Sequence, residues 1–284
     1  MDKCVPTRGD NQPGARLKVG DHDYRAFVGP PEQYDVMGAT QFSLLCALGL
    51  RSDHRLLDIG CGSLRAGRLF IAYLNPGGYV GLEPNKWLVD DALEKEIGSD
   101  VVALKAPVFV HNGEFDISGL DVFDFIVAQS IASHTGPSMT KQLLRTIRQG
   151  LAPMGTAVVT FMHSRRFDNT AEGWFYPDCV LYRRQTIEGW IDEADLRGVA
   201  MAWFHPRQSW WLLVPKDAEI PSRLFRSLAR GETLALTRSW NPLARARRPL
   251  NRLRASVVGA IPASTRALAV TMRAAVERAR TRRP

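Results

Sequence analysis

Between residues 55 and 214, short apolar runs alternate with segments whose apolar residues recur at helical spacing. The short runs predict five strands, at Arg55–Ile59, Tyr79–Leu82, Val108–His111, Val122–Ala128 and Thr156–Phe161. The periodic segments predict helices at Leu64–Leu74, Asn85–Ile97, Ser138–Gly150 and Thr186–Leu196. Two final runs, Val199–His205 and Ser209–Val214, predict a hairpin. Alternating strands and helices of this kind indicate an α/β fold with a mostly parallel sheet.

A glycine turn, Asp58-Ile59-Gly60-Cys61-Gly62-Ser63-Leu64-Arg65, follows the first predicted strand and precedes the first predicted helix. Three interpretations compete for it. A dinucleotide-binding G-x-G-x-x-G turn would need a glycine where Arg65 stands, and a phosphate-binding P-loop would need a lysine that is absent. The third interpretation places the acidic residue first, as D-x-G-x-G.

This third pattern resembles motif I of the class I S-adenosylmethionine-dependent methyltransferases, E/D-x-G-x-G-x-G, with Leu64 at the last glycine position. The order of strands and helices extends the resemblance over residues 34–216. The resemblance implies a Rossmann-like, doubly wound, mostly parallel seven-stranded sheet whose last strand is antiparallel, and an enzyme that uses S-adenosyl-L-methionine. We therefore expect an N-terminal arm at 1–33, a methyltransferase domain at 34–216 and a basic tail at 217–284.

The same turn and the next strand supply the expected cofactor ligands. Gly60 and Gly62, with Cys61 between them, allow a ligand to approach bare backbone. Asp58 is placed to attract the amino group of the methionine moiety. Glu83, after the second strand, can accept hydrogen bonds from both ribose hydroxyls; the alternative is a solvated residue before a turn.

Two loops complete the expected cofactor pocket. The family usually offers an acidic or amide side chain and an apolar wall to adenine after the third strand. Glu114 and Phe115 are our choice there, with Asn112 and Asp116 as open alternatives. Gln129, after the fourth strand, is expected to line the pocket.

His134 is the candidate general base, because it lies in the loop that faces the transferred methyl group in this fold and because histidine titrates near neutral pH. The alternative is a histidine that packs or caps the following helix. No [DNS]-P-P-[YFW] or Pro-Cys follows the fourth strand, and no aspartate-rich set indicates a catalytic metal. By elimination, the acceptor atom is expected to be an oxygen of a small molecule, sugar or lipid-linked compound.

Two segments could shape the acceptor pocket. Phe27–Gln41 leads into an apolar helix that could cap the cofactor, and His163–Arg184 carries aromatic residues beside arginines. Trp174 and Tyr176 are the candidate acceptor-binding residues there; the alternative is a lid that packs its aromatics into its own core. Of the adjacent Trp210 and Trp211, one is expected in the core and neither is assigned a function.

The net charge of +8 is concentrated in the tail, because residues 1–216 carry −3 and residues 217–284 carry +11. The tail could form basic amphipathic helices that lie on an anionic membrane. Nucleic acid is the less favoured alternative partner, and a tail that binds neither is the third alternative.

The four cysteines show no zinc or CxxC spacing. With no signal-peptide core in the sequence, we expect a cytoplasmic protein whose tail could reach the inner face of the membrane. An RNA methyltransferase and a non-catalytic binding protein remain the alternative functions.

Overall fold

A computed structural model describes residues 17–218. Residues 219–284 of the predicted basic tail and residues 1–16 of the predicted arm lie outside the described residues. Helices occupy η1 (Pro31–Gln33), α1 (Tyr34–Leu48), α2 (Gly67–Tyr73), α3 (Lys86–Ala92), η2 (Leu93–Ile97), α4 (Ser99–Lys105), α5 (Pro137–Gly150) and α6 (Arg184–Glu193). Strands occupy β1 (Leu56–Ile59), β2 (Tyr79–Leu82), β3 (Val108–Val110), β4 (Phe123–Ala128), β5 (Leu151–Phe161), β6 (His163–Ser164), β7 (Tyr182–Arg183), β8 (Leu196–Met201) and β9 (Ser209–Pro215).

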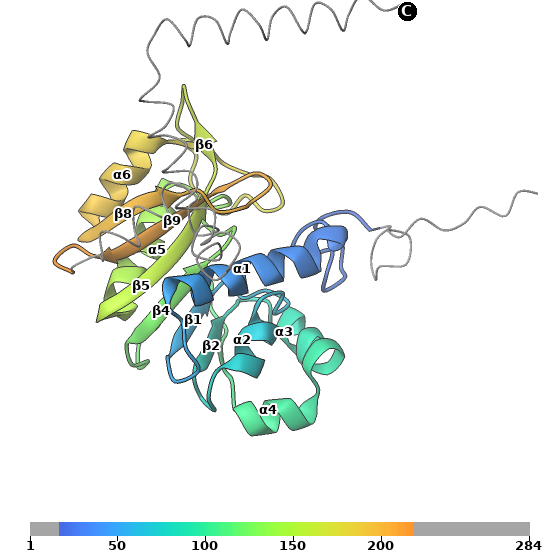
Figure 1. Cartoon of the computed structure of the whole chain (residues 1–284). Helices are drawn as coiled ribbons and strands as arrows, with labels where there is room; N and C mark the ends of the chain where they lie inside the picture. The colour runs from blue at the N-terminus through green and yellow to red at the C-terminus, as the bar shows by residue number, and fades with distance from the viewer. Residues whose placement is uncertain (1–16, 219–284) are drawn as a thin grey trace, which may run out of the picture. The chain divides into compact units, whose positions relative to one another are not determined.

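The main sheet has seven strands in the order β3-β2-β1-β4-β5-β9-β8 (Figure 1). The first five strands of this order pair in parallel, whereas β9 pairs antiparallel with both β5 and β8. This confirms the predicted seven-stranded sheet with an antiparallel last strand, and it confirms the closing hairpin. Because β9 lies between β5 and β8, both of its edges are hydrogen-bonded, and apolar cores cover both of its faces.

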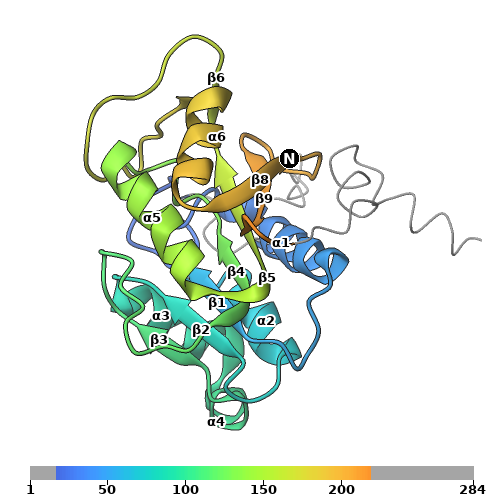
Figure 2. The ribbon, with the colours of Figure 1, turned by 90° about the vertical axis from the view of Figure 1, so that its left-hand side faces the viewer.

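Helices cover both faces of the sheet, and each face has its own apolar core. Side chains of α5 and α6 pack on one face with Leu57 and Ile59 of β1, as Figure 2 shows for the two helices. Side chains of α1, α2 and α3 pack on the other face with Leu56. Neighbouring residues of β1 therefore point to opposite cores, as the pleat of a fully buried parallel strand requires.

Both tryptophans of β9 are fully buried, which corrects the expectation that only one would lie in the core. Trp211 belongs to the α5–α6 core and Trp210 to the α1–α2 core. The reason is the internal position of β9, because a strand covered on both faces buries consecutive side chains. Within residues 17–218, no helix is both long and apolar enough to cross a membrane.

Candidate active site

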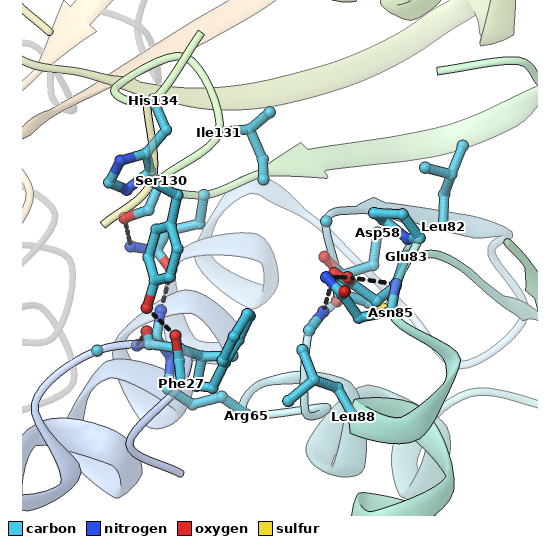
Figure 3. Close-up of a pocket in the computed structure, with 18 of the residues that line it drawn as sticks. Phe27, Asp58, Arg65, Leu82, Glu83, Asn85, Leu88, Ser130, Ile131 and His134 are labelled. Atoms are coloured by element: carbon cyan, nitrogen blue, oxygen red, sulfur yellow. Dashed lines mark hydrogen bonds between the residues drawn. The ribbon is translucent and has the colours of Figure 1, made fainter. Parts of the chain in front are cut away.

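A cavity of about 420 Å³ opens at the carboxyl ends of β1, β2 and β4, where ligands bind in doubly wound sheets. The glycine turn forms part of its wall, and the arm at residues 19–29 and the loop at residues 174–177 line it as well. Figure 3 shows the two sides: Asp58, Glu83 and Asn85 gather on one, and His134 lies on the other with Ser130 and Phe27. The volume falls within the range of small-molecule sites.

The glycine turn is shaped by two residues in the left-handed region. Gly60 has φ +70° and Gly62 has φ +53°. A Cβ on Gly60 would lie 2.1 Å from Ile131 Cδ1, and one on Gly62 would lie 2.7 Å from Val28 Cγ1. Both positions therefore exclude a side chain on conformational and steric grounds, and both leave backbone exposed to the cavity.

Leu64 also has a left-handed backbone, with φ +55°, and it stands where the family pattern has its last glycine. Its side chain is fully buried in the α1–α2 core. The turn thus keeps the conformation that glycine favours although leucine occupies the position. Because a residue with a left-handed backbone cannot be part of a right-handed helix, α2 begins at Gly67 rather than at Leu64 as predicted.

Glu83 is held at the carboxyl end of β2 by the residues around it. Its Oε2 accepts a hydrogen bond from Gly62 N at 3.1 Å, and its Oε1 accepts bonds from Asn85 N at 2.9 Å and Asn85 Nδ2 at 2.8 Å. Burial raises the pKa of Glu83, although these three donors favour its charged form. A carboxylate offers about four acceptor positions, so capacity remains for a ligand hydroxyl in the cavity.

Asp58 is buried and lines the cavity. Its Oδ2 accepts a hydrogen bond from the Tyr79 hydroxyl at 2.9 Å. Burial raises the pKa of Asp58 to about 7, because the charged carboxylate is poorly solvated there. A cationic ligand group beside Asp58 would restore the charged form.

Cys61 lies between the two glycines with its side chain packed over β2, where a Cβ on Gly81 would lie 2.8 Å from its sulfur. The residue lines the cavity. Burial raises the pKa of the Cys61 thiol, so the thiol stays neutral and acts as part of the apolar wall.

The loop after β3 brings Phe115 and Asn112 to the cavity but not Glu114. Glu114 is exposed, and its Oε2 accepts a hydrogen bond from Gly113 N within its own loop. Glu114, the predicted residue, therefore does not line the cavity, whereas its alternative Asn112 does. The loop turns through Phe115, whose φ of +55° directs neighbouring side chains differently from an extended strand end.

A polar network follows β4. Gln129 Nε2 donates to Ser130 Oγ at 2.5 Å, and Gln129 Oε1 accepts from the Arg65 guanidinium. Ser130 has φ +61°, and its N–H donates to Thr160 Oγ1 at 2.7 Å on β5. This network fixes the sharp turn between β4 and the loop that carries His134.

His134 lines the cavity and is buried. Its Nδ1 lies 2.6 Å from the backbone oxygen of Asp178, and since a carbonyl can only accept, Nδ1 carries the proton. The neutral ring therefore keeps an acceptor lone pair on Nε2. Burial lowers the pKa of His134, partly offset by the bond to Asp178. The ring is thus neutral at pH 7 and has the tautomer that a general base needs.

Two segments distant in sequence close the cavity. The Tyr176 hydroxyl donates to the backbone oxygen of Phe27, and the two rings pack with centroids 5.4 Å apart. Arg65 Nη1 donates to the backbone oxygen of Val28 at 3.0 Å. We call residues 17–33, the described part of the predicted N-terminal arm, the arm. The hydrogen bonds from Tyr176 to Phe27 O and from Arg65 to Val28 O are together called the arm latch. Trp174 and Tyr176 line the cavity beside His134, with ring centroids 5.9 and 5.0 Å from its ring.

Several lining residues were not predicted as site residues, among them Arg65, Asn85, Ile131 and Arg207. For Arg65 a signal existed, because it follows the D-x-G-x-G pattern in the same turn. Among the described residues, no group of three or more His, Cys, Asp or Glu side chains is arranged to hold a metal.

The strand order, the glycine turn and the acidic residue after β2 define a Rossmann-like methyltransferase fold. Residues 57–157 match the family model of a methyltransferase domain. In structure, the chain is similar to the PH0226 protein from Pyrococcus horikoshii OT3, with 16% identity over 71% of this chain and 97% of that one and a TM-score of 0.53. It is also similar to DhpI in its SAH complex, with 15% identity, 69% and 94% coverage and a TM-score of 0.51.

No curated protein sequence matches this chain. Over residues 57–157 the chain matches the model of a methyltransferase domain, and its seven-stranded sheet has the matching fold, in agreement with the resemblance of the glycine turn.

Proposed function

We propose that this enzyme transfers the methyl group of S-adenosyl-L-methionine to a hydroxyl oxygen of a small-molecule, sugar or lipid-linked acceptor, with His134 as general base. The observation that carries the proposal is the tautomer of His134, whose Nδ1–H is engaged by Asp178 O, so that Nε2 stays an acceptor on a residue that lines the cavity. Oxygen acceptors lose a proton on methylation, so they benefit most from such a base.

The residues around the glycine turn fit the methyl donor. The bare backbone of Gly60 and Gly62 accommodates a ligand at contact distance, which side chains at either position would prevent. Glu83 would accept hydrogen bonds from ribose, Asp58 would face the α-ammonium, and Phe115 and Asn112 would border the adenine. When bound, the donor supplies a methyl group activated by a sulfonium.

His134 would act at one stated atom. The acceptor hydroxyl would lie against Nε2, and its oxygen lone pair would form the new C–O bond while the C–S pair returns to sulfur. The hydroxyl proton would pass to Nε2. Asp178 O then stabilises the imidazolium, because it already accepts the Nδ1 proton. The aromatic rings of Trp174 and Tyr176 would hold the acceptor beside the base.

The test is a methyl-transfer assay with labelled S-adenosylmethionine and fractionated metabolite pools, one arm of it treated with ribonuclease. Label in a ribonuclease-insensitive product whose methyl group NMR assigns to an oxygen supports an oxygen acceptor on a small molecule, and a methyl group on nitrogen or carbon contradicts it. Label lost with ribonuclease treatment favours the RNA alternative. Absence of transfer by folded protein that binds S-adenosylhomocysteine favours the non-catalytic alternative.

His134→Gln tests the base once an acceptor is found. We expect kcat to fall by about 10²–10⁴-fold with an unchanged Kd for S-adenosylhomocysteine. His54→Gln is the matched control, because His54 precedes β1 at the opposite end of the strand from the cavity. Equal turnover of His134→Gln and wild type would reduce His134 to a packing residue.

A further inference from the structure

Arg65 lies in the wall of the cavity at the junction of the glycine turn, the arm and the end of β4 (Figure 3). Its guanidinium donates to two oxygens, Val28 O at 3.0 Å and Gln129 Oε1. Both acceptors are neutral. The hydrogen bonds position the group, but they do not balance its charge.

Within residues 17–218, no carboxylate lies within salt-bridge distance of Arg65, and its buried Nε has no hydrogen-bond partner. The buried Nε of Arg68, three residues further on, also has no partner, but the Arg68 guanidinium pairs with both Glu96 and Asp35. The two carboxylates of the cavity are engaged elsewhere, Asp58 by Tyr79 and Glu83 by backbone and amide N–H groups. Asp58 attracts the Arg65 guanidinium from beyond ion-pair distance, but burial raises the pKa of Asp58, so it offsets the Arg65 charge only in part. A partly buried cation that no carboxylate contacts is costly to keep in a folded protein.

We infer that Arg65 is the cation of an anion-binding subsite, and that it takes a carboxylate or phosphate group of a ligand in this cavity. The guanidinium has five N–H donors, of which two are engaged, so its planar fork can still bind an oxyanion. Arg207, which also lines the cavity and has no carboxylate partner among the described residues, adds positive charge to the same wall.

This inference rests on the proposed function, and it leaves two sources for the anion. One is the methionyl carboxylate of the donor, which is attached to the same carbon as the ammonium expected at Asp58. The other is an anionic group on the acceptor. The chemistry recognised is the same, so the experiment separates the sources.

The first arm measures calorimetric Kd values of wild type, Arg65→Gln and Arg65→Lys for S-adenosylhomocysteine and for its decarboxylated analogue. If Arg65 binds the donor carboxylate, wild type prefers S-adenosylhomocysteine by about 10- to 100-fold, Arg65→Gln loses this preference and Arg65→Lys keeps part of it. The ratio of the two Kd values is the readout, because loss of arm packing weakens both ligands equally. Arg148→Gln, an exposed pair with Asp195, controls for net charge.

The second arm titrates inorganic phosphate into the complexes with S-adenosylhomocysteine. Phosphate binding to wild type but not to Arg65→Gln, with no carboxylate preference in the first arm, assigns the anion to the acceptor. Equal behaviour of all variants in both arms overturns the inference while leaving the proposed function intact. Folded wild type that binds neither adenosyl compound overturns the proposed function itself.

Discussion

Asp58 links donor binding to pH. In the free enzyme, burial raises its pKa to about 7 from an ordinary 3.8, so the side chain is largely protonated below neutral pH. A bound α-ammonium favours the carboxylate and returns the pKa towards its ordinary value. The ligand therefore binds the deprotonated form, and affinity falls as the pH drops below about 7.

The magnitude follows from the size of the pKa change. Each pH unit below about 7 costs about tenfold in Kd until the pKa of the complex is reached. Between pH 8 and pH 5, the Kd of S-adenosylhomocysteine should rise by nearly 100-fold. At pH 6, binding should release close to one proton, which calorimetry in buffers of different ionisation enthalpy detects.

The stability of the free enzyme should fall as the pH rises, whereas its affinity for the donor should increase. An acid whose folded-state pKa is raised stabilises the fold at low pH, and this contribution is lost as the pH rises through about 7. Between pH 5 and pH 8 the loss is roughly 2.7 kcal/mol for two pKa units. Asp58→Asn should remove the loss, so ligand-free Asp58→Asn should be more stable than wild type at pH 8 while binding the donor less tightly.

Asp90→Asn, on the exposed surface of α3, is the control for these measurements. A Kd that is independent of pH between 5 and 8, without proton release, would refute the role of Asp58. A pH dependence that persists in Asp58→Asn would identify Glu83, whose pKa is also raised by burial, as the titrating group instead.

Three further substitutions test the turn and the arm. Gly60→Ala should abolish donor binding in calorimetry, and Ile131→Ala added to it should restore part of the affinity, since the new Cβ would lie 2.1 Å from Ile131 Cδ1. Leu64→Gly relieves the left-handed backbone but removes a fully buried side chain, so urea unfolding should show a net loss of about 1–3 kcal/mol. An increase in stability would mean that backbone strain outweighs packing. Tyr176→Phe breaks one bond of the arm latch, so amides of residues 17–33 should exchange faster by hydrogen–deuterium exchange, with unchanged exchange in β9.

The strands around the site were predictable because buried parallel strands are short apolar runs. Tyr79–Leu82 has its predicted bounds, and β1 and β4 differ from theirs by one residue. In contrast, β5 begins at Leu151, five residues before its predicted start. Pro153 and Gly155 in that first half are typical of a turn, and the pairing with β4 is shifted in register there.

Helix α4 illustrates what periodicity cannot detect. No residue of Ser99–Lys105 is fully buried, and Val101, which is partly buried, packs against the α1–α2 core. A contact this small gives too weak an apolar stripe for the pattern that identifies amphipathic helices. The π-helical turn η2 before it lies inside the predicted helix Asn85–Ile97, although the pattern does not distinguish a π-helical turn from an α-helix.

The residues of the candidate site also fall into those that the sequence predicts and those that only the structure reveals. Residues attached to the glycine turn or to strand ends, such as Gly60, Glu83 and His134, follow from sequence order, because the sheet delivers every parallel strand end to one edge. Glu114 and Asn112 could not be separated, since a loop decides which side chain turns inward. Arg65 was missed because its significance lies in the carboxylate that it lacks, which only three-dimensional contacts reveal.

The arm latch binds the arm through main-chain oxygens, those of Phe27 and Val28. Every amino acid carries such an oxygen, so these two hydrogen bonds do not depend on which side chains the arm displays, whereas the packing of Phe27 on Tyr176 does. Val19, Phe27 and Val28 form part of the cavity wall. Exchanging Val19 or Val28 would therefore change the lining while both hydrogen bonds and the Phe27 packing stay in place, which makes these two positions a natural starting point for redesigning acceptor choice.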